Sequence, residues 1–190
     1  MKLLERAKKL IDLGFFEGIE DIDAKSLVQE AQEELGDMLE EAPATALLLV
    51  GGAVLEIEPD AAAELEGYAT VLAEVQEFCG DAFEISGVRA EFVKDKVVMS
   101  AGEESGRVVS LRFRIDGESR ELEVTHYDDM IDLGFLGEIN GWLERISHPE
   151  RLCPLVELMD DVARYVFVKP EAMDKAELDE IITAADFEQG

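Results

Sequence analysis

The chain of 190 residues is 47% apolar and 33% charged, which is the composition of a globular protein rather than of a disordered one. Its formal net charge of −28 is spread evenly along the sequence, and this disfavours direct binding to nucleic acid or to an anionic membrane because every part would repel phosphate. No run is long enough to span a bilayer, no secretory signal is visible, and two cysteines are too few for a disulfide framework or a zinc site, so we expect a cytoplasmic protein without a cofactor.

The order of the expected elements predicts a single α+β domain over residues 1–190. Residues 1–80 should be mainly helical. Residues 81–190 should hold a mostly antiparallel sheet of about five to seven strands, between residues ~82 and ~168, packed with helices at ~129–146 and ~171–185.

The first helix is expected over residues 2–13, where apolar side chains recur on one face. Gly14 directly after it is typical of a helix end closed by glycine. A second helix should begin near Asp23 or Ser26, either of which can cap it, and should end before Pro43.

The outer face of this second helix is unusually acidic. Lys25 is the only cation from residue 10 to residue 88, and carboxylates recur four residues apart, each such pair costing a helix about 0.2–0.5 kcal/mol. One interpretation is a solvated face kept acidic for solubility, and the other is a docking face for a basic protein partner. The residues of that docking face would be Glu30, Glu33, Glu34, Asp37, Glu40 and Glu41.

The apolar run after Pro43 is expected to form a buried helix over residues 44–51 and an extended segment over 54–57, although periodicity alone leaves strand open as an alternative for the first part. A further helix should open at Pro59-Asp60 and close at Gly80. Short strands are then expected at 83–85, 89–93 and 97–100.

The stretch from Arg107 to Tyr127 predicts a β-hairpin on which the sheet should be built. Apolar and polar residues alternate on both sides of a turn at Asp116-Gly117-Glu118-Ser119. A two-residue turn would pair Arg112 with Glu121, and a four-residue turn would pair Arg114 with Glu121. Both registers have the same parity. The apolar face should therefore carry Leu111, Phe113, Leu122 and Val124.

The last third should begin with a helix capped by Asp128 or Asp129 and ending near residue 146. Its three glycines, Gly134, Gly137 and Gly141, would let that helix lie close to a sheet. A second hairpin is expected from residues 152–158 and 162–168. Pro154 should place the first of these strands at a sheet edge. A final helix should start at Pro170 and turn Leu178, Ile181 and Ile182 inward.

One group of residues could carry chemistry. His126 lies on the inward face of the return strand, next to Asp128 and Asp129, and a histidine with carboxylates can hold a metal or act as a general base. Carboxylates also stabilise a helix start through its dipole and free amides, so a structural histidine beside a capped helix is the alternative.

No catalytic motif occurs, and an enzyme would need a site built from residues far apart in the sequence. We therefore expect a non-enzymatic, acidic interaction module that binds a basic protein partner. Its sharpest form is an inhibitor or immunity-type protein whose carboxylates take the place of phosphates in a toxin's basic active site. This expectation rests on charge and not on resemblance to a family. The alternatives are an enzyme or metal-binding protein centred on His126, Asp128 and Asp129, and a scaffold whose acidity serves only solubility.

Overall fold

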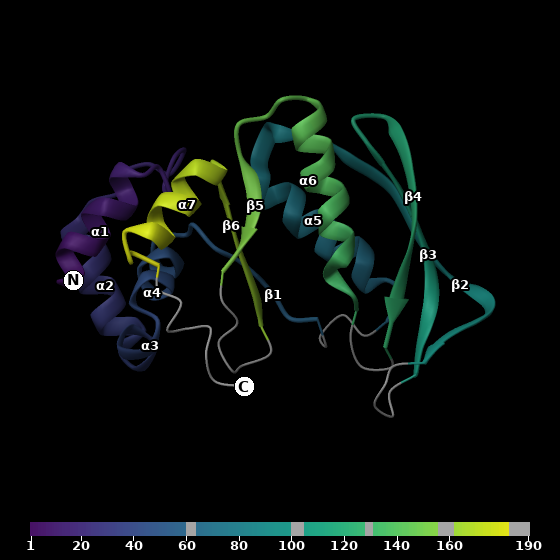
Figure 1. Ribbon diagram of the computed structural model, residues 1–190, viewed down its shortest axis with the longest axis horizontal. Coiled ribbons are helices and arrows are strands. Elements are labelled where there is room, and N and C mark those ends of the chain that lie inside the picture. The colour runs from purple at the N-terminus through teal and green to yellow at the C-terminus, as the bar shows by residue number, and fades with distance from the viewer. Residues whose placement is uncertain (60–63, 100–104, 128–130, 156–161, 183–190) are drawn as a thin grey trace. The chain divides into compact units, whose positions relative to one another are not determined.

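The computed structural model describes residues 1–59, 64–99, 105–127, 131–155 and 162–182, and these confirm the α+β class (Figure 1). The strands of the described residues form two three-stranded antiparallel sheets rather than one sheet. The chain divides into two compact units, one made of Met1–Glu56 with Pro149–Gly190 and the other of Ile57–His148. The expectation of a single domain stays a prediction.

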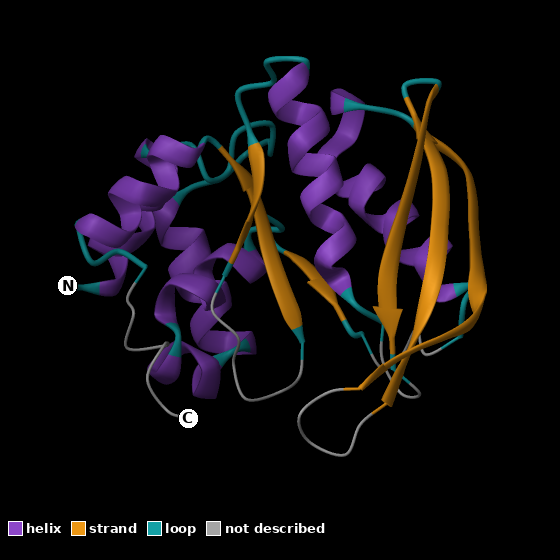
Figure 2. Cartoon of the chain, turned by 45° about the vertical axis from the view of Figure 1, so that its right-hand side comes forward, coloured by secondary structure: helices purple, strands orange, loops and turns teal. Residues whose placement is uncertain are grey.

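The first unit combines a small sheet, in the order β1-β6-β5, with helices gathered on one side of it (Figures 1 and 2). Its elements are α1 (Leu3–Asp12), α2 (Ala24–Glu34), α3 (Gly36–Glu41), α4 (Pro43–Val50), β1 (Leu55–Ile57), β5 (Arg151–Pro154), β6 (Ala163–Val168) and α7 (Pro170–Leu178). The boundary between the units falls inside β1, after Glu56.

The end of α1 follows the sequence prediction. Gly14 takes a φ of +86°, a conformation that costs glycine little. Its N–H donates to the carbonyl of Ile11, and the N–H of Phe15 donates to the carbonyl of Leu10 at 3.2 Å. These two bonds make a Schellman motif, and they direct Phe15 into the core beside Leu10.

The second predicted helix is interrupted. The side chain of Asp23 caps α2 by accepting from the backbone N–H groups of Lys25 and Ser26. Leu35 then leaves the helical region, with φ −126° and ψ 39°, and α3 begins at Gly36. Glycine disfavours continuation of a helix, which gives a physical reason for a break at this position.

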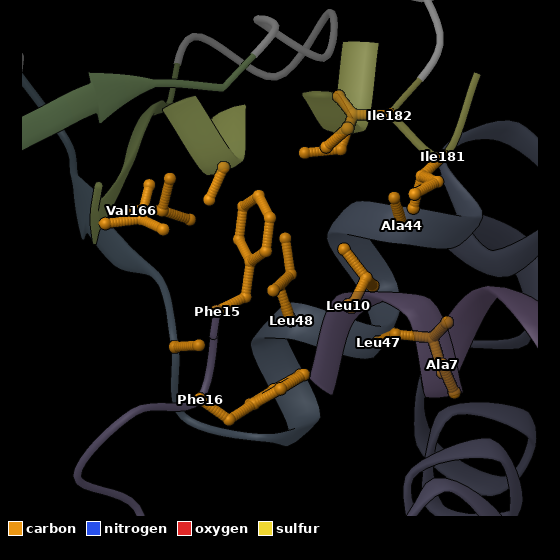
Figure 3. Close-up of a cluster of buried hydrophobic side chains, with 14 of the residues drawn as sticks. Ala7, Leu10, Phe15, Phe16, Ala44, Leu47, Leu48, Val166, Ile181 and Ile182 are labelled. Carbon is orange, nitrogen blue, oxygen red and sulfur yellow. The ribbon is translucent and has the colours of Figure 1, made fainter. Parts of the chain in front are cut away.

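The core of the first unit joins residues from both ends of the sequence (Figure 3). Leu47 and Leu48 of α4 are fully buried and meet Leu10 of α1 and Phe15. Residues from the C-terminal part of the chain, among them Val166 and Ile181, complete the same cluster. The prediction of a buried helix after Pro43 is therefore confirmed, because every residue of α4 from Ala44 to Leu48 is buried.

The C-terminal strand pair and helix are also found, but the helix ends at Leu178 rather than near residue 185. Residues 156–161 of the predicted hairpin lie outside the described residues. β5 pairs with β6 in antiparallel fashion and lies at the edge of its sheet, as Pro154 indicated. Ile181 and Ile182 are buried, but the side chain of Leu178 is 84% exposed, so its predicted inward position is wrong. Leu178 is the last residue of α7, and the two isoleucines follow the end of that helix.

The second unit consists of a sheet in the order β2-β3-β4, with two helices against one face of it (Figures 1 and 2). Its elements are α5 (Gly67–Cys79), the 3₁₀ turn η1 (Gly80–Ala82), β2 (Ile85–Met99), β3 (Ser105–Ile115), β4 (Glu118–His126), the 3₁₀ turn η2 (Leu133–Phe135) and α6 (Leu136–Arg145).

The central hairpin of β3 and β4 takes the register of the two-residue turn, in which Arg112 pairs with Glu121. Asp116 and Gly117 both have positive φ, +49° and +80°, which is the pattern of a type I′ turn. Leu111 and Phe113 are at most 2% exposed, so the predicted inner face is correct.

The predicted strands 89–93 and 97–100 belong to one long strand in the structure, apart from Ser100, which lies outside the described residues. Of the predicted strand 83–85 only Ile85 belongs to it. β2 runs from Ile85 to Met99, and its pairing with β3 shifts register between Ser86 and Arg89 and between Phe92 and Val97. The sequence pattern breaks at these two irregularities, because an extra residue in one strand reverses the side-chain alternation.

The helices of the second unit begin later than predicted. α5 starts at Gly67 rather than at Asp60, which lies outside the described residues. α6 follows η2, whose cap is Asp132, while the predicted caps Asp128 and Asp129 lie outside the described residues. A Cβ at Gly137 or Gly141 would meet no neighbouring atom within 4 Å, so the prediction that these glycines allow close packing is wrong.

Asp116 ties three parts of the second unit together. Its carboxylate accepts a hydrogen bond from the backbone N–H of Glu84 at 2.8 Å and another from the indole Nε1–H of Trp142 in α6 at 2.8 Å. Its own N–H donates to the carbonyl of Glu84. The hairpin turn is thereby fixed to the start of β2 and to α6.

Replacing Phe113 with alanine should lower the free energy of unfolding by about 3–5 kcal/mol, because the ring is buried on the inner face of β3. Urea titration followed by circular dichroism measures this loss. Arg114→Ala is the matched control, since its exposed neighbouring side chain should cost no more than about 0.5 kcal/mol. A loss below about 1 kcal/mol for Phe113→Ala would contradict the burial of this face.

Replacing Asp116 with alanine should cost about 1–3 kcal/mol, because the N–H groups of Glu84 and Trp142 both lose their acceptor. Trp142 is the only tryptophan, so its fluorescence reports this joint directly. Asp116→Asn keeps an acceptor oxygen and tolerates positive φ, and it should recover part of the loss. Equal stability and equal fluorescence in wild type and Asp116→Ala would refute the role of this carboxylate.

Candidate functional site

The six carboxylates predicted to form a docking face all lie exposed on α2 and α3. Among the described residues none of them forms an ion pair, and Glu33 accepts only a hydrogen bond from Nε2 of Gln29 at 2.9 Å. Glu30 and Glu34 lie one turn apart within α2 and repel each other. The predicted pair Glu33–Asp37 does not lie on one helix, because the chain breaks at Leu35 between α2 and α3. The six carboxylates are therefore exposed as expected, but they are divided between two short helices instead of lying on one.

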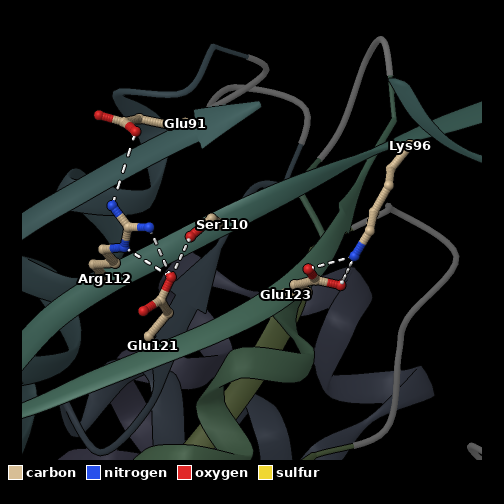
Figure 4. Close-up of polar contacts among 6 residues, drawn as sticks. All are labelled: Glu91, Lys96, Ser110, Arg112, Glu121 and Glu123. Carbon is tan, nitrogen blue, oxygen red and sulfur yellow. Dashed lines mark hydrogen bonds and ion pairs between the residues drawn. The ribbon is translucent and has the colours of Figure 1, made fainter. Parts of the chain in front are cut away.

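On the sheet of the second unit, in contrast, carboxylates form ion pairs with neighbouring cations (Figure 4). Glu121 lies 2.8 Å from the guanidinium of Arg112 and also accepts from the hydroxyl of Ser110, and these contacts lower its pKa, with the Arg112 hydrogen bond the largest cause. Glu123 lies 2.6 Å from Nζ of Lys96. Acidity is therefore neutralised locally on this sheet and left unneutralised on α2 and α3.

A mainly apolar hollow adjoins the acidic face. It has a volume of about 340 Å³ and is bordered by Leu3, Leu39 and Pro43, with Glu40 and the buried Arg6 also in its lining. Met1, which also borders the hollow, is 51% exposed. A surface that combines carboxylates with an apolar depression offers both charge and an anchor point to a protein partner.

His126 lies at the end of β4, where it is 5% exposed and faces inward as predicted. Its ring lies 5.6 Å from that of Phe92 in β2 and 5.9 Å from that of Tyr68 in α5. Its Nδ1 has no hydrogen-bond partner within the described part of the chain. Two segments far from His126 in the sequence, α5 and β2, thus each place an aromatic ring against this histidine.

Tyr68 is fully buried beside His126, and its hydroxyl likewise has no partner among the described residues. Burial, the largest cause, and the nearby carboxylate of Asp132 together raise the pKa of this phenol to about 12, against a smaller opposing effect of the Asp132 backbone. Tyr68 is therefore neutral at physiological pH.

The metal alternative gains no support from the described residues. They contain no group of three histidine, cysteine, aspartate or glutamate side chains placed to hold an ion. Asp128 and Asp129, the other proposed ligands beside His126, lie outside the described ranges. Within the described residues, the structure thus places the rings of Tyr68 and Phe92 against His126 rather than a set of carboxylates.

Sequence reasoning missed the surroundings of His126. Tyr68 followed the apolar stripe of a helix and Phe92 the alternation of a strand, and both patterns indicate only burial. Nothing in the sequence signals that these rings would meet one histidine, because the contact depends on how α5 and β2 pack.

Comparison with protein-family models, curated proteins and solved structures finds no match to this chain. None of the helices in the described residues is long and apolar enough to cross a membrane.

The raised pKa of Tyr68 predicts an alkaline loss of stability. The unfolded phenol ionises near pH 10 while the folded one holds its proton to about 12, so the stability contributed by the buried neutral form is present below pH 10 and falls as the pH rises toward 12. Ultraviolet titration of the three tyrosines should show one that ionises last, together with unfolding. Tyr68→Phe should abolish this late step and Tyr165→Phe should keep it; a late step that survives Tyr68→Phe would contradict the assignment.

Proposed function

We propose that this protein is a non-enzymatic interaction module that binds a basic protein partner through α2 and α3. The observation that carries the proposal is the contrast between the two acidic surfaces. Glu121 and Glu123 form ion pairs with Arg112 and Lys96, whereas the six carboxylates of α2 and α3 form no ion pair within the described residues.

Unneutralised carboxylates carry a cost that a partner could remove. Glu30 with Glu34, and Asp37 with Glu41, are like-charge pairs one helical turn apart, and each costs about 0.2–0.5 kcal/mol in the free protein. Arginine or lysine side chains from a partner would relieve this repulsion and gain charge-assisted hydrogen bonds. The exposed position of the carboxylates also favours fast, salt-sensitive association.

The partner we infer has a basic patch with at least one apolar side chain beside it. The basic patch would meet the carboxylates, and the apolar side chain would enter the hollow next to Glu40. A basic site that normally holds phosphate has this character, which supports the inhibitor or immunity-type form of the proposal. A scaffold that is acidic only for solubility would need neither the hollow nor the clustering.

The test compares a charge reversal on the proposed face with the same change elsewhere. Tagged protein is incubated with lysate of its native host, washed at low and then at high salt, and the retained proteins are identified by mass. Glu33→Lys with Asp37→Lys should weaken capture of a basic protein by about tenfold or more. The free energy of unfolding of the same variant should be higher than that of the wild type by about 0.2–0.5 kcal/mol, because the substitutions remove like-charge repulsion.

Glu74→Lys with Glu77→Lys is the control, since both residues are exposed on α5 and the change in net charge is identical. It should retain the partner at a level close to that of the wild type. Equal loss in both variants would mean that only total charge matters, and equal retention in both would exclude α2 and α3 as the docking face. If no basic protein is captured at low salt, the proposed function is wrong and the acidity serves solubility.

A further inference from the structure

Three arginines lie together on the outer face of the second unit's sheet, the face opposite the two helices (Figures 1 and 2). Arg112 and Arg114 alternate along β3 with the buried Leu111 and Phe113, so both point outward. Arg89 of β2 is the direct cross-strand partner of Arg112. All three arginines are exposed, and we call them the arginine cluster. Like charges directly opposite each other destabilise a sheet, so this arrangement has a cost in the free protein.

A bulge in β2 brings Arg89 into this cluster. Ser86 pairs with Arg114 and Arg89 pairs with Arg112, so β2 has one residue more than β3 between these two pairs. In a regular register Val88 would lie opposite Arg112, and Arg89 would point to the inner face. Bulges often redirect a side chain at a functional site. Here the extra residue places a third guanidinium on the outer face.

The carboxylates around the cluster leave two of its arginines without an ion pair. Arg112 lies 2.8 Å from Glu121 and 4.0 Å from Glu91 (Figure 4). Arg89 and Arg114 form no ion pair within the described part of the chain, although the protein has 45 acidic residues. Arginine stays charged in proteins and has five N–H donors. These two guanidiniums can therefore bind an anion from outside the chain.

Two serines extend the set of donors. Ser86 of β2 and Ser119 of β4 are the direct partners of Arg114 on its two sides, and both are exposed. Strands lie about 5 Å apart and successive side chains on one face about 7 Å apart, so the cluster and both serines share an area of about 10 by 7 Å. Guanidinium and hydroxyl groups can all donate hydrogen bonds to one anion placed over this area.

A phosphate monoester matches these donors better than a carboxylate does. It offers three acceptor oxygens and a charge of about −1.5 to −2 at pH 7, and guanidiniums bind such oxygens through two parallel N–H groups. A nucleic acid or an anionic membrane carries many phosphates and would be repelled by the chain's net charge of −28. A single phosphorylated side chain meets much less of this repulsion.

We propose that the arginine cluster, together with Ser86 and Ser119, binds a phosphorylated side chain of a partner protein. Arg89 and Arg114 would hold the phosphate oxygens, and the two serine hydroxyls would donate to the same group. The proposal does not depend on the proposed role of α2 and α3, which belong to the other unit.

The experiment titrates ¹⁵N-labelled protein with the blocked peptide Ala-phosphoserine-Ala in a phosphate-free buffer of low ionic strength. Parallel titrations use the same peptide with serine or with aspartate at the central position. We expect the phosphopeptide at millimolar concentration to shift the backbone amide signals of Ser86, Arg89, Arg114 and Ser119. The serine peptide should shift none of them, and the aspartate peptide should bind at least about fivefold more weakly.

Charge variants then locate the binding surface. Arg89→Gln with Arg114→Gln should weaken phosphopeptide binding by about three- to tenfold, as expected for the loss of two exposed charge contacts. Lys2→Gln with Lys8→Gln is the control, since both lysines are exposed in the first unit and the change in net charge is the same. It should change binding by less than about twofold. Thermal unfolding followed by circular dichroism verifies that both variants are folded.

Three outcomes would overturn the proposal. One is that the phosphopeptide leaves the four amide signals unshifted, and another is that both double variants lose the same affinity. The third concerns the class of partner, and it is tested with a single-stranded DNA oligonucleotide under the same conditions. An oligonucleotide that bound more tightly than the phosphopeptide would mean that the arginine cluster is a nucleic-acid surface.

Discussion

Electrostatic self-repulsion is the constraint that the whole structure must satisfy, because 45 acidic residues face only 17 lysines and arginines. Part of this repulsion is relieved by ion pairs between exposed side chains. Arg112 and Lys96 hold the outer carboxylates of the sheet, Arg145 reaches Glu118 near the hairpin turn at 3.0 Å, and Lys169 pairs with Glu17 in the first unit at 2.8 Å. Lys25 is the only lysine or arginine in α2 and α3, and the excess negative charge gathers there.

A small number of polar contacts also hold the elements of each unit together. In the second unit the carboxylate of Asp116 holds the hairpin turn, the start of β2 and Trp142 of α6, and the guanidinium of Arg145 lies 4.1 Å from the centre of the same indole ring. In the first unit Arg164 is 3% exposed yet bonds Glu56 of β1 at 2.9 Å. A buried guanidinium requires such a partner, because an unpaired charge in the interior would be costly.

The proposed face on α2 and α3 is exposed and charged. Binding there should therefore depend on long-range attraction, and the affinity should fall as the salt concentration rises.

Sequence alone determined the features that depend on neighbours along the chain. Alternation and turn chemistry predicted the hairpin around Asp116-Gly117 and its buried face, glycine chemistry predicted the end of α1, and proline predicted the edge strand β5. The exposure of the acidic residues also followed from their pattern, since charged side chains are rarely buried without a partner. Sequence did not predict the break at Leu35 or the single strand β2, because a local kink or bulge leaves the composition unchanged. Only the tertiary structure decided that the strands form two sheets and that His126 meets Tyr68 and Phe92, since both depend on contacts between segments far apart in the chain.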